Sequence, residues 1–139
     1  MLERDDGWMA ALSSSSRESA EAVARKRTMR LDLGGLVEAW VASVRRIIRG
    51  SGEDYYEDYA CYLGWREILD EVLAAVPETD AAVIGRAIEP ADTAFRNHTI
   101  DDGGVALSRY LNVRTDRWYW RRIPTDGPIA RSLGIPETK

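Results

Sequence analysis

The most regular pattern of apolar and polar positions in the chain runs from Leu33 to Arg49. Apolar side chains recur there at intervals of three and four residues, which is the spacing of one helical face, and charged residues fill much of the opposite face. Asp32 is a suitable N-cap before this segment, and Gly50 a suitable terminator after it. The pattern predicts an amphipathic helix with Trp40 in the middle of its buried stripe.

A second helical pattern extends from Glu53 to Val76 and is apolar over much of its circumference. A helix of this kind is expected at the centre of a domain, in contact with several neighbours. The preceding residues 51–54 resemble a capping box, and Pro77 should end the helix because a proline disfavours helical geometry in the residue before it. Cys61 is interpreted as a small buried hydrophobic residue.

A third helix is expected to follow Thr79, which can cap it, and its apolar stripe continues in phase as far as Phe95. Pro90 interrupts this stripe and leaves two alternatives. Either one helix kinks at the proline, or a new helix starts at Glu89 with the proline in its first turn.

The N-terminal residues carry a weaker pattern. Residues 5–12 predict a short helix with Trp8, Met9 and Leu12 facing inward. The serine run 13–16 is expected to loosen the chain, and 16–29 is expected to form a weaker helix.

Beyond a turn at 101–104, the period becomes ambiguous. Residues 105–111 suit a short helix, whereas 117–123 alternates like a strand, with Trp118 and Trp120 on the buried side and Tyr119 on the other. The Pro- and Gly-rich residues 124–139 predict an irregular arm.

Together these elements predict one all-α domain over residues 1–139, a size typical of a single core. The expected architecture is a small bundle of three to four main helices with an irregular aromatic C-terminal arm. Residues 1–30 are a less certain helical segment, and residues 124–139 are an irregular tail. An α+β fold with a short C-terminal hairpin near Val113 and Trp120 is the alternative.

Composition narrows the class of protein. Hydrophobic residues make up 45% and charged residues 30% of the chain, which is typical of a globular protein. Short apolar runs and an acidic N-terminus predict neither a membrane span nor a signal peptide, so a cytoplasmic location is expected. With one Cys and one His, neither a disulfide nor a histidine-rich metal site is expected, and Glu67, Asp70 and Glu71 are interpreted as a solvated helix face. We therefore expect no metal and no cofactor.

Charge is distributed unevenly along the chain. Residues 51–102 contain thirteen acidic and three basic residues, while the flanking segments are basic, and the net charge is −4. Such asymmetry influences association with charged partners. The alternative is that the basic ends fold onto the acidic middle and neutralise part of it.

The most unusual local composition is acidic and tyrosine-rich. The predicted partner-binding residues are Glu53, Asp54, Tyr55, Tyr56, Glu57 and Asp58. Carboxylates suit basic groups and tyrosines supply amphipathic contact area, so the sequence predicts a protein-interaction module that masks a basic partner surface. A small acidic inhibitor of the immunity or antitoxin kind is one form of it, and self-association stays open.

Two alternatives to protein binding were weighed. A small-ligand binder or enzyme would use a pocket formed by the residues Tyr59, Tyr62, His98, Arg117 and Arg121. The chain shows no nucleophile motif, phosphate-binding loop or dinucleotide fingerprint, so we lean against an enzyme. Basic clusters at 25–30 and 117–122 suggest nucleic-acid binding, but the acidic net charge argues against it.

Overall fold

The computed structural model describes residues 7–50 and 54–135. Its elements in chain order are η1 (Gly7–Ala11), α1 (Ser14–Lys26), α2 (Leu33–Arg49), α3 (Tyr56–Ala75), α4 (Glu78–Asn97), β1 (Thr99–Asp101), α5 (Val105–Ser108), η2 (Trp118–Arg121), β2 (Arg122–Pro124) and α6 (Gly127–Ser132). The four long helices confirm the predicted helical bundle, to which a two-stranded antiparallel sheet is added. Within the described ranges, no helix combines the length and apolarity needed to cross a membrane.

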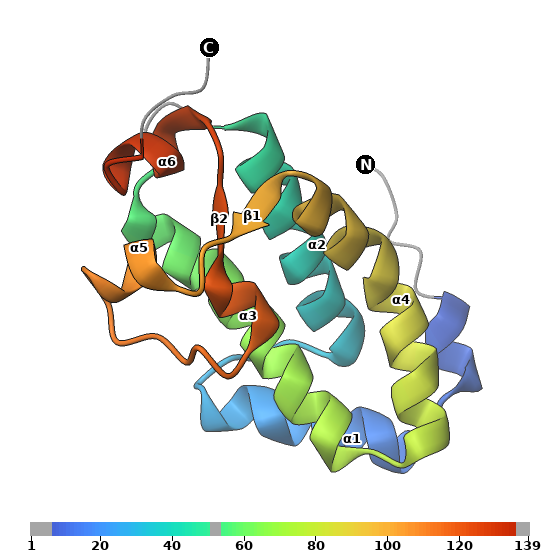
Figure 1. Ribbon diagram of the computed structural model, residues 1–139. Coiled ribbons are helices and arrows are strands. Elements are labelled where there is room, and N and C mark those ends of the chain that lie inside the picture. The colour runs from blue at the N-terminus through green and yellow to red at the C-terminus, as the bar shows by residue number, and fades with distance from the viewer. Residues whose placement is uncertain (1–6, 51–53, 136–139) are drawn as a thin grey trace.

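Helix α3 occupies the central position that its broad apolar surface predicts. It packs against α2 and α1, and α4 contacts both α2 and α3 (Figure 1). The small elements α5, η2, β2 and α6 gather around the first half of α3, whereas α1 crosses near its last turns. The molecule therefore has a four-helix body and one end that is built from short elements.

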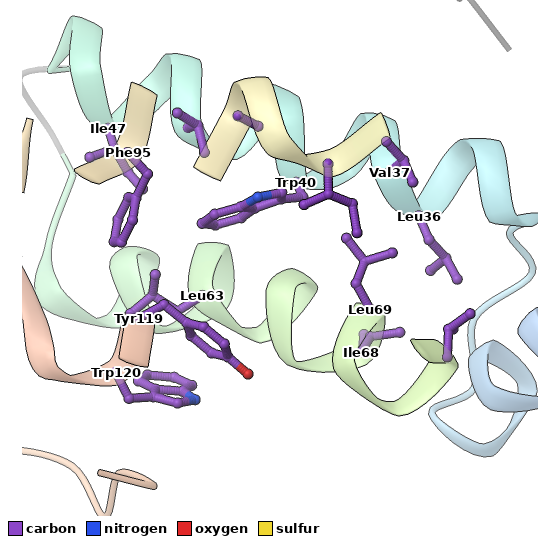
Figure 2. Packing of buried hydrophobic residues seen from close by; sticks show 14 of the residues in the cluster. Leu36, Val37, Trp40, Ile47, Leu63, Ile68, Leu69, Phe95, Tyr119 and Trp120 are labelled. Atoms are coloured by element: carbon purple, nitrogen blue, oxygen red, sulfur yellow. The ribbon is translucent and has the colours of Figure 1, made fainter. Parts of the chain in front are cut away.

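The core lies between α2, α3 and α4, and Trp40 is fully buried within it, as its place in the stripe predicts (Figure 2). Its indole ring meets the ring of Phe95 edge to face, with the centroids 5.4 Å apart. Leu36, Leu63 and Leu69 are fully buried in the same cluster. Burying a side chain as large as Trp40 stabilises a domain by several kcal/mol, typically about 3–5 relative to alanine.

The helix ends agree with the sequence at α2 and differ elsewhere. The carboxylate of Asp32 accepts a hydrogen bond from the Gly35 amide, and Gly50 ends the helix with a left-handed φ of 69°. The predicted start of α3 at Glu53 lies outside the described residues, and the observed helix begins at Tyr56. Its expected end is confirmed at Ala75, before the proline.

The predicted cap of the third helix is wrong. Pro77, rather than Thr79, occupies the N-cap position of α4, because proline suits the extended geometry that precedes a helix. The helix then runs without a break through Pro90, which lies on its exposed side, so no new helix starts at Glu89.

The serine run does not loosen the chain. Ser13 caps α1, its Oγ accepting from the Ser16 amide, and the helix extends from Ser14 to Lys26 rather than 16–29. Both serine hydroxyls donate to Asp80 at the start of α4, at 2.9 and 2.5 Å. The carboxylate of Asp80 thus holds the Ser13 and Ser16 hydroxyls in a segment whose sequence predicts a loose loop. The expected helix over 5–12 is a short 3₁₀ helix within the described residues.

The strand predicted over 117–123 is mostly wrong. The backbone of 117–121 forms a tight turn of 3₁₀ helix, in which the Trp120 amide donates to the Arg117 carbonyl, so side chains do not alternate between two faces. Tyr119, expected on the outer side, is fully buried, Trp120 is buried, and Trp118 is half-buried. Tertiary contacts of these aromatic rings outweigh the local strand pattern.

The sheet is not the hairpin offered as the alternative. Strand β2 pairs with β1, and Ile123 lies opposite Ile100, across an intervening stretch that includes α5 and η2. The tail is also more regular than predicted, since Gly127–Ser132 forms α6 with Pro128 in its first turn.

Candidate functional site

The predicted partner-binding segment lies at the start of α3. Glu53 falls outside the described residues. Asp54 is only 5% exposed, and its Oδ1 accepts from Arg46 Nη2 and from the Tyr62 hydroxyl, both at 3.3 Å. Arg46 Nε also donates to the Tyr62 oxygen at 2.7 Å. Asp54 is thus committed to an internal cluster with the last turns of α2.

Two further features of this cluster concern its chemistry. Burial raises the pKa of the Tyr62 hydroxyl, which keeps it a proton donor at neutral pH. The second carboxylate oxygen of Asp54, Oδ2, is buried and has no hydrogen-bond partner among the described residues. A buried acceptor without a donor is unfavourable, and the described residues supply none for this oxygen.

Asp58 also serves the fold. Its carboxylate accepts a hydrogen bond from the Tyr55 amide at 2.8 Å and so completes the cap of α3. Glu57, by contrast, is exposed and forms no ion pair with any described residue. Of the described carboxylates in the segment, only the one on Glu57 is directed to solvent without a structural partner.

The tyrosines of the segment lie at the surface. The Tyr55 side chain is 63% exposed, and the ring of Tyr56 stacks on that of Tyr110, with the centroids 4.6 Å apart and the planes inclined by 20°. Tyr110 follows α5 and is 46% exposed. We name the group Tyr55, Tyr56, Tyr110 and Glu57 the tyrosine patch. Tyr110 lies more than fifty residues further along the chain than the predicted segment, so no local pattern connects the two.

The large hydrophobic side chains that are strongly exposed among the described residues are Ile48, Tyr55, Ile100, Val105 and Tyr110. They belong to the last turn of α2, the residue before α3, β1, α5 and the residue pair after α5. Two of them, Tyr55 and Tyr110, are members of the tyrosine patch.

The acidic middle of the chain is largely neutralised. Arg27 pairs with Glu71, and Arg114 lies 3.3 Å from Glu67. Further pairs join Arg46 to Asp54, Arg117 to Asp70 and Arg121 to Asp101. The alternative explanation of the charge asymmetry, in which basic ends fold onto acidic helices, accounts for much of it. The acidity that remains for a partner is local rather than spread over the whole segment.

The residues of the alternative ligand site are dispersed. Tyr59 is buried, and its hydroxyl donates to the Arg122 carbonyl at 2.6 Å. His98 is exposed at the end of α4, with its ring nitrogen 2.9 Å from the Ala94 carbonyl. Arg117 and Arg121 contact Asp70 and Asp101, respectively, and Tyr62 belongs to the Asp54 cluster. The five side chains therefore do not converge on one point.

Two cavities lie elsewhere on the surface. One, of about 540 Å³, lies between the end of α2 and the start of α6, with Arg49, Asp126 and Arg131 among its lining residues. The other, of about 360 Å³, lies where α1 leads into α2 and is lined in part by Arg25 and Arg30. Neither cavity is lined by a residue of the alternative ligand site.

A buried polar network was not anticipated from the sequence. Arg66, in the middle of α3, donates to both oxygens of Asp92 on α4, at 3.0 and 3.1 Å. The indole of Trp40 donates to the same carboxylate at 2.9 Å, so three helices meet there. The only signal in the sequence is that these two charged residues fall within otherwise apolar helical stripes.

The network continues to η2. Arg66 also donates to Asp70 at 2.7 Å, and the hydroxyl of Tyr119 donates to the other oxygen of Asp70 at 2.7 Å. Burial, together with this carboxylate, raises the pKa of Tyr119 far above its usual range, so the hydroxyl stays protonated. The network therefore anchors η2 to the central helix.

The expectation that Cys61 is buried is wrong, since it is exposed on α3.

Neither metal coordination nor known relatives suggest a function. Across 7–50 and 54–135, no group of three or more His, Cys, Asp or Glu residues is placed to hold a metal ion. Comparison with known proteins finds no matching family model, no matching curated protein and no matching solved structure. The functional argument therefore depends on the surface residues themselves.

Proposed function

We propose that the protein is an interaction module that docks on a basic surface of another protein through the tyrosine patch. The observation that carries this proposal is the exposure of Tyr55 and of Tyr110, whose ring stacks on Tyr56, at the start of α3, where Glu57 is exposed and forms no ion pair with a described residue. Tyrosine provides a large apolar area and a polar hydroxyl on a side chain with little conformational freedom to lose, and it is enriched in protein interfaces. A masking inhibitor of the immunity or antitoxin kind is one form that such a module takes.

Electrostatics sets how the partner is recognised. Because many carboxylates of the acidic middle are paired, the patch offers one carboxylate, that of Glu57, without an ion pair to a described residue, and not an extended acidic face. An isolated charge at the edge of an interface affects the association rate and the choice of partner more than the total affinity. We therefore expect moderate salt dependence, with most of the affinity coming from the tyrosines.

The test uses variants of the patch and a matched control. The full chain is immobilised, and proteins from a lysate of the organism that encodes it are captured by wild type, Tyr55→Ser, Glu57→Lys and Glu78→Lys. Glu78 is also an exposed glutamate in the first turn of a helix, α4, so its reversal changes net charge equally at another place. Tyr55 and Glu57 are surface residues, and their substitution is expected to change the free energy of unfolding by less than about 0.5 kcal/mol.

The expected result is one protein retained by wild type and by Glu78→Lys, and lost or strongly reduced with Tyr55→Ser and Glu57→Lys. The purified partner should associate with the wild-type chain more slowly as the salt concentration is raised. A partner that every variant retains equally would refute this docking face, as would association that is indifferent to ionic strength.

A further inference from the structure

We infer that a second copy of this chain covers the tyrosine patch when no other partner is bound, in a two-fold contact that pairs Glu57 of each copy with Arg109 of the other. The inference goes beyond the proposed function, because it concerns the free protein. It depends on two exposed charges of opposite sign that border the same aromatic surface.

The two charges come from the two elements whose tyrosine rings stack. Glu57 follows Tyr56 in the first turn of α3, and Arg109 is the C-cap of α5, directly before Tyr110. The stack of Tyr56 on Tyr110 brings these two segments together. Glu57 and Arg109 are both exposed, and neither forms an ion pair with any residue in the described ranges. The border of the aromatic surface therefore carries one acid and one base that the chain itself does not neutralise.

The same surface exposes apolar area that a contact can bury. Besides Tyr55 and Tyr110, the side chain of Val105 is 57% exposed. Arg109 keeps helical backbone angles, so Val105 and Arg109 lie one turn apart on the same side of α5. Removing apolar area from water favours association. The area offered by these few side chains is small compared with a permanent interface, so a weak and reversible dimer is expected.

A two-fold axis makes this surface complementary to itself. In a symmetric contact, a residue of one copy meets a second residue of the other copy, and the reverse pair forms as well. An axis near the stacked rings brings Glu57 of each copy to Arg109 of the other, while the tyrosines of both copies meet between the charges. An identical copy thus matches both charges at once, whereas a surface of one sign matches only one of them.

Reversing the two charges separates this contact from other arrangements. Glu57→Arg gives a chain with two bases at this surface, and Arg109→Glu gives a chain with two acids, so each variant repels its own copies. Symmetry uses each pair twice, and a single reversal should therefore weaken self-association about ten-fold. An equimolar mixture of the two variants restores both pairs across the contact, and so does the double variant. Glu78→Lys on α4 is the matched control for a reversed surface charge.

Sedimentation equilibrium of the full chain, from micromolar to millimolar concentration, measures the association. Wild type, Glu78→Lys, the mixture and the double variant should form a dimer reversibly with similar affinity, and each single variant should form it about ten-fold more weakly. Recovery in the mixture also shows that both single variants are folded.

A wild-type chain that stays monomeric throughout would overturn the inference, as would a mixture that associates no more tightly than its separate components. The proposed function is tested separately. If wild type is monomeric while Tyr55→Ser still loses the captured partner, the docking face stands and the inference fails. If the dimer responds to the reversals as expected while every variant retains the same captured protein, the inference stands and the proposed function fails.

Discussion

Replacing Asp92 by alanine tests whether the buried polar network holds the helices together. Asp92 is 4% exposed and accepts three hydrogen bonds, two from Arg66 and one from the indole of Trp40. Arg66 is itself only 7% exposed, so the substitution leaves a guanidinium inside the protein with Asp70 as its remaining carboxylate. The shape of the core changes little by comparison, because the deleted group is small.

The magnitude follows from the burial of both partners. Removing one partner of a buried ion pair costs about 3–5 kcal/mol, because the other charge stays desolvated. Typical domains have only about 5–15 kcal/mol of stability in total, so this is a large fraction. Adding Arg66→Met to Asp92→Ala removes the unpaired charge. It leaves the Trp40 indole without an acceptor and Asp70 Oδ1 without its Arg66 donor, at a cost of about 1–3 kcal/mol. The double variant should therefore be more stable than Asp92→Ala alone.

Urea unfolding followed by tryptophan fluorescence measures both variants. With a slope near 2 kcal/mol per molar urea, as is typical of small proteins, Asp92→Ala should lower the midpoint by about 2 M. The double variant should recover roughly half of that loss. A loss below about 1 kcal/mol in Asp92→Ala would refute the reasoning, as would a double variant that is no more stable than the single one.

Two further predictions concern the backbone and pH. Gly104→Ala should destabilise the protein more than Gly103→Ala. Both glycines have a left-handed φ, but only at Gly104 would an added Cβ come close to another side chain, at 2.7 Å from Thr115 Cγ2. Equal melting temperatures of the two variants would contradict this prediction. Hydrogen bonds from Ser16 and Ser13 lower the pKa of Asp80 below its usual value near 4. The stabilisation of the folded protein by these hydrogen bonds is therefore complete above about pH 4 and is lost as the pH falls through the lowered pKa. As the pH is lowered from 6 to 2, the melting temperature should fall more steeply for wild type than for Asp80→Asn. Parallel curves would contradict the stabilising role of the ionised Asp80 carboxylate.

The candidate site was predictable only in part. The segment 53–58 stood out by composition, and the exposure of Glu57 could be expected from a polar helix start, whereas the helical stripe placed Tyr55 on the buried side. That Asp54 is buried and that Tyr110 completes the patch could not, since both depend on contacts with α2 and with the residues after α5. Local sequence reports what a residue prefers, whereas its partners come from segments that only folding brings near.

The sequence by itself determined the long helices. The sequence shows the apolar stripe of 33–49 with its caps, the broad apolar surface of the next helix, and the end of that helix before Pro77. Each of these features depends on residues within a few helical turns, so the sequence pattern predicts it without knowledge of the tertiary structure.

Only the tertiary structure decided the conformation of 117–121 and the partners of the charged side chains. Tyr119 turns inward because Asp70, 49 residues earlier, accepts its hydroxyl, and the serine run at 13–16 becomes ordered because Asp80 receives its donors. Short segments such as 117–121 have too few local hydrogen bonds to fix their own conformation. Their geometry is therefore chosen by burial and by polar groups on distant helices, and a local pattern cannot report these.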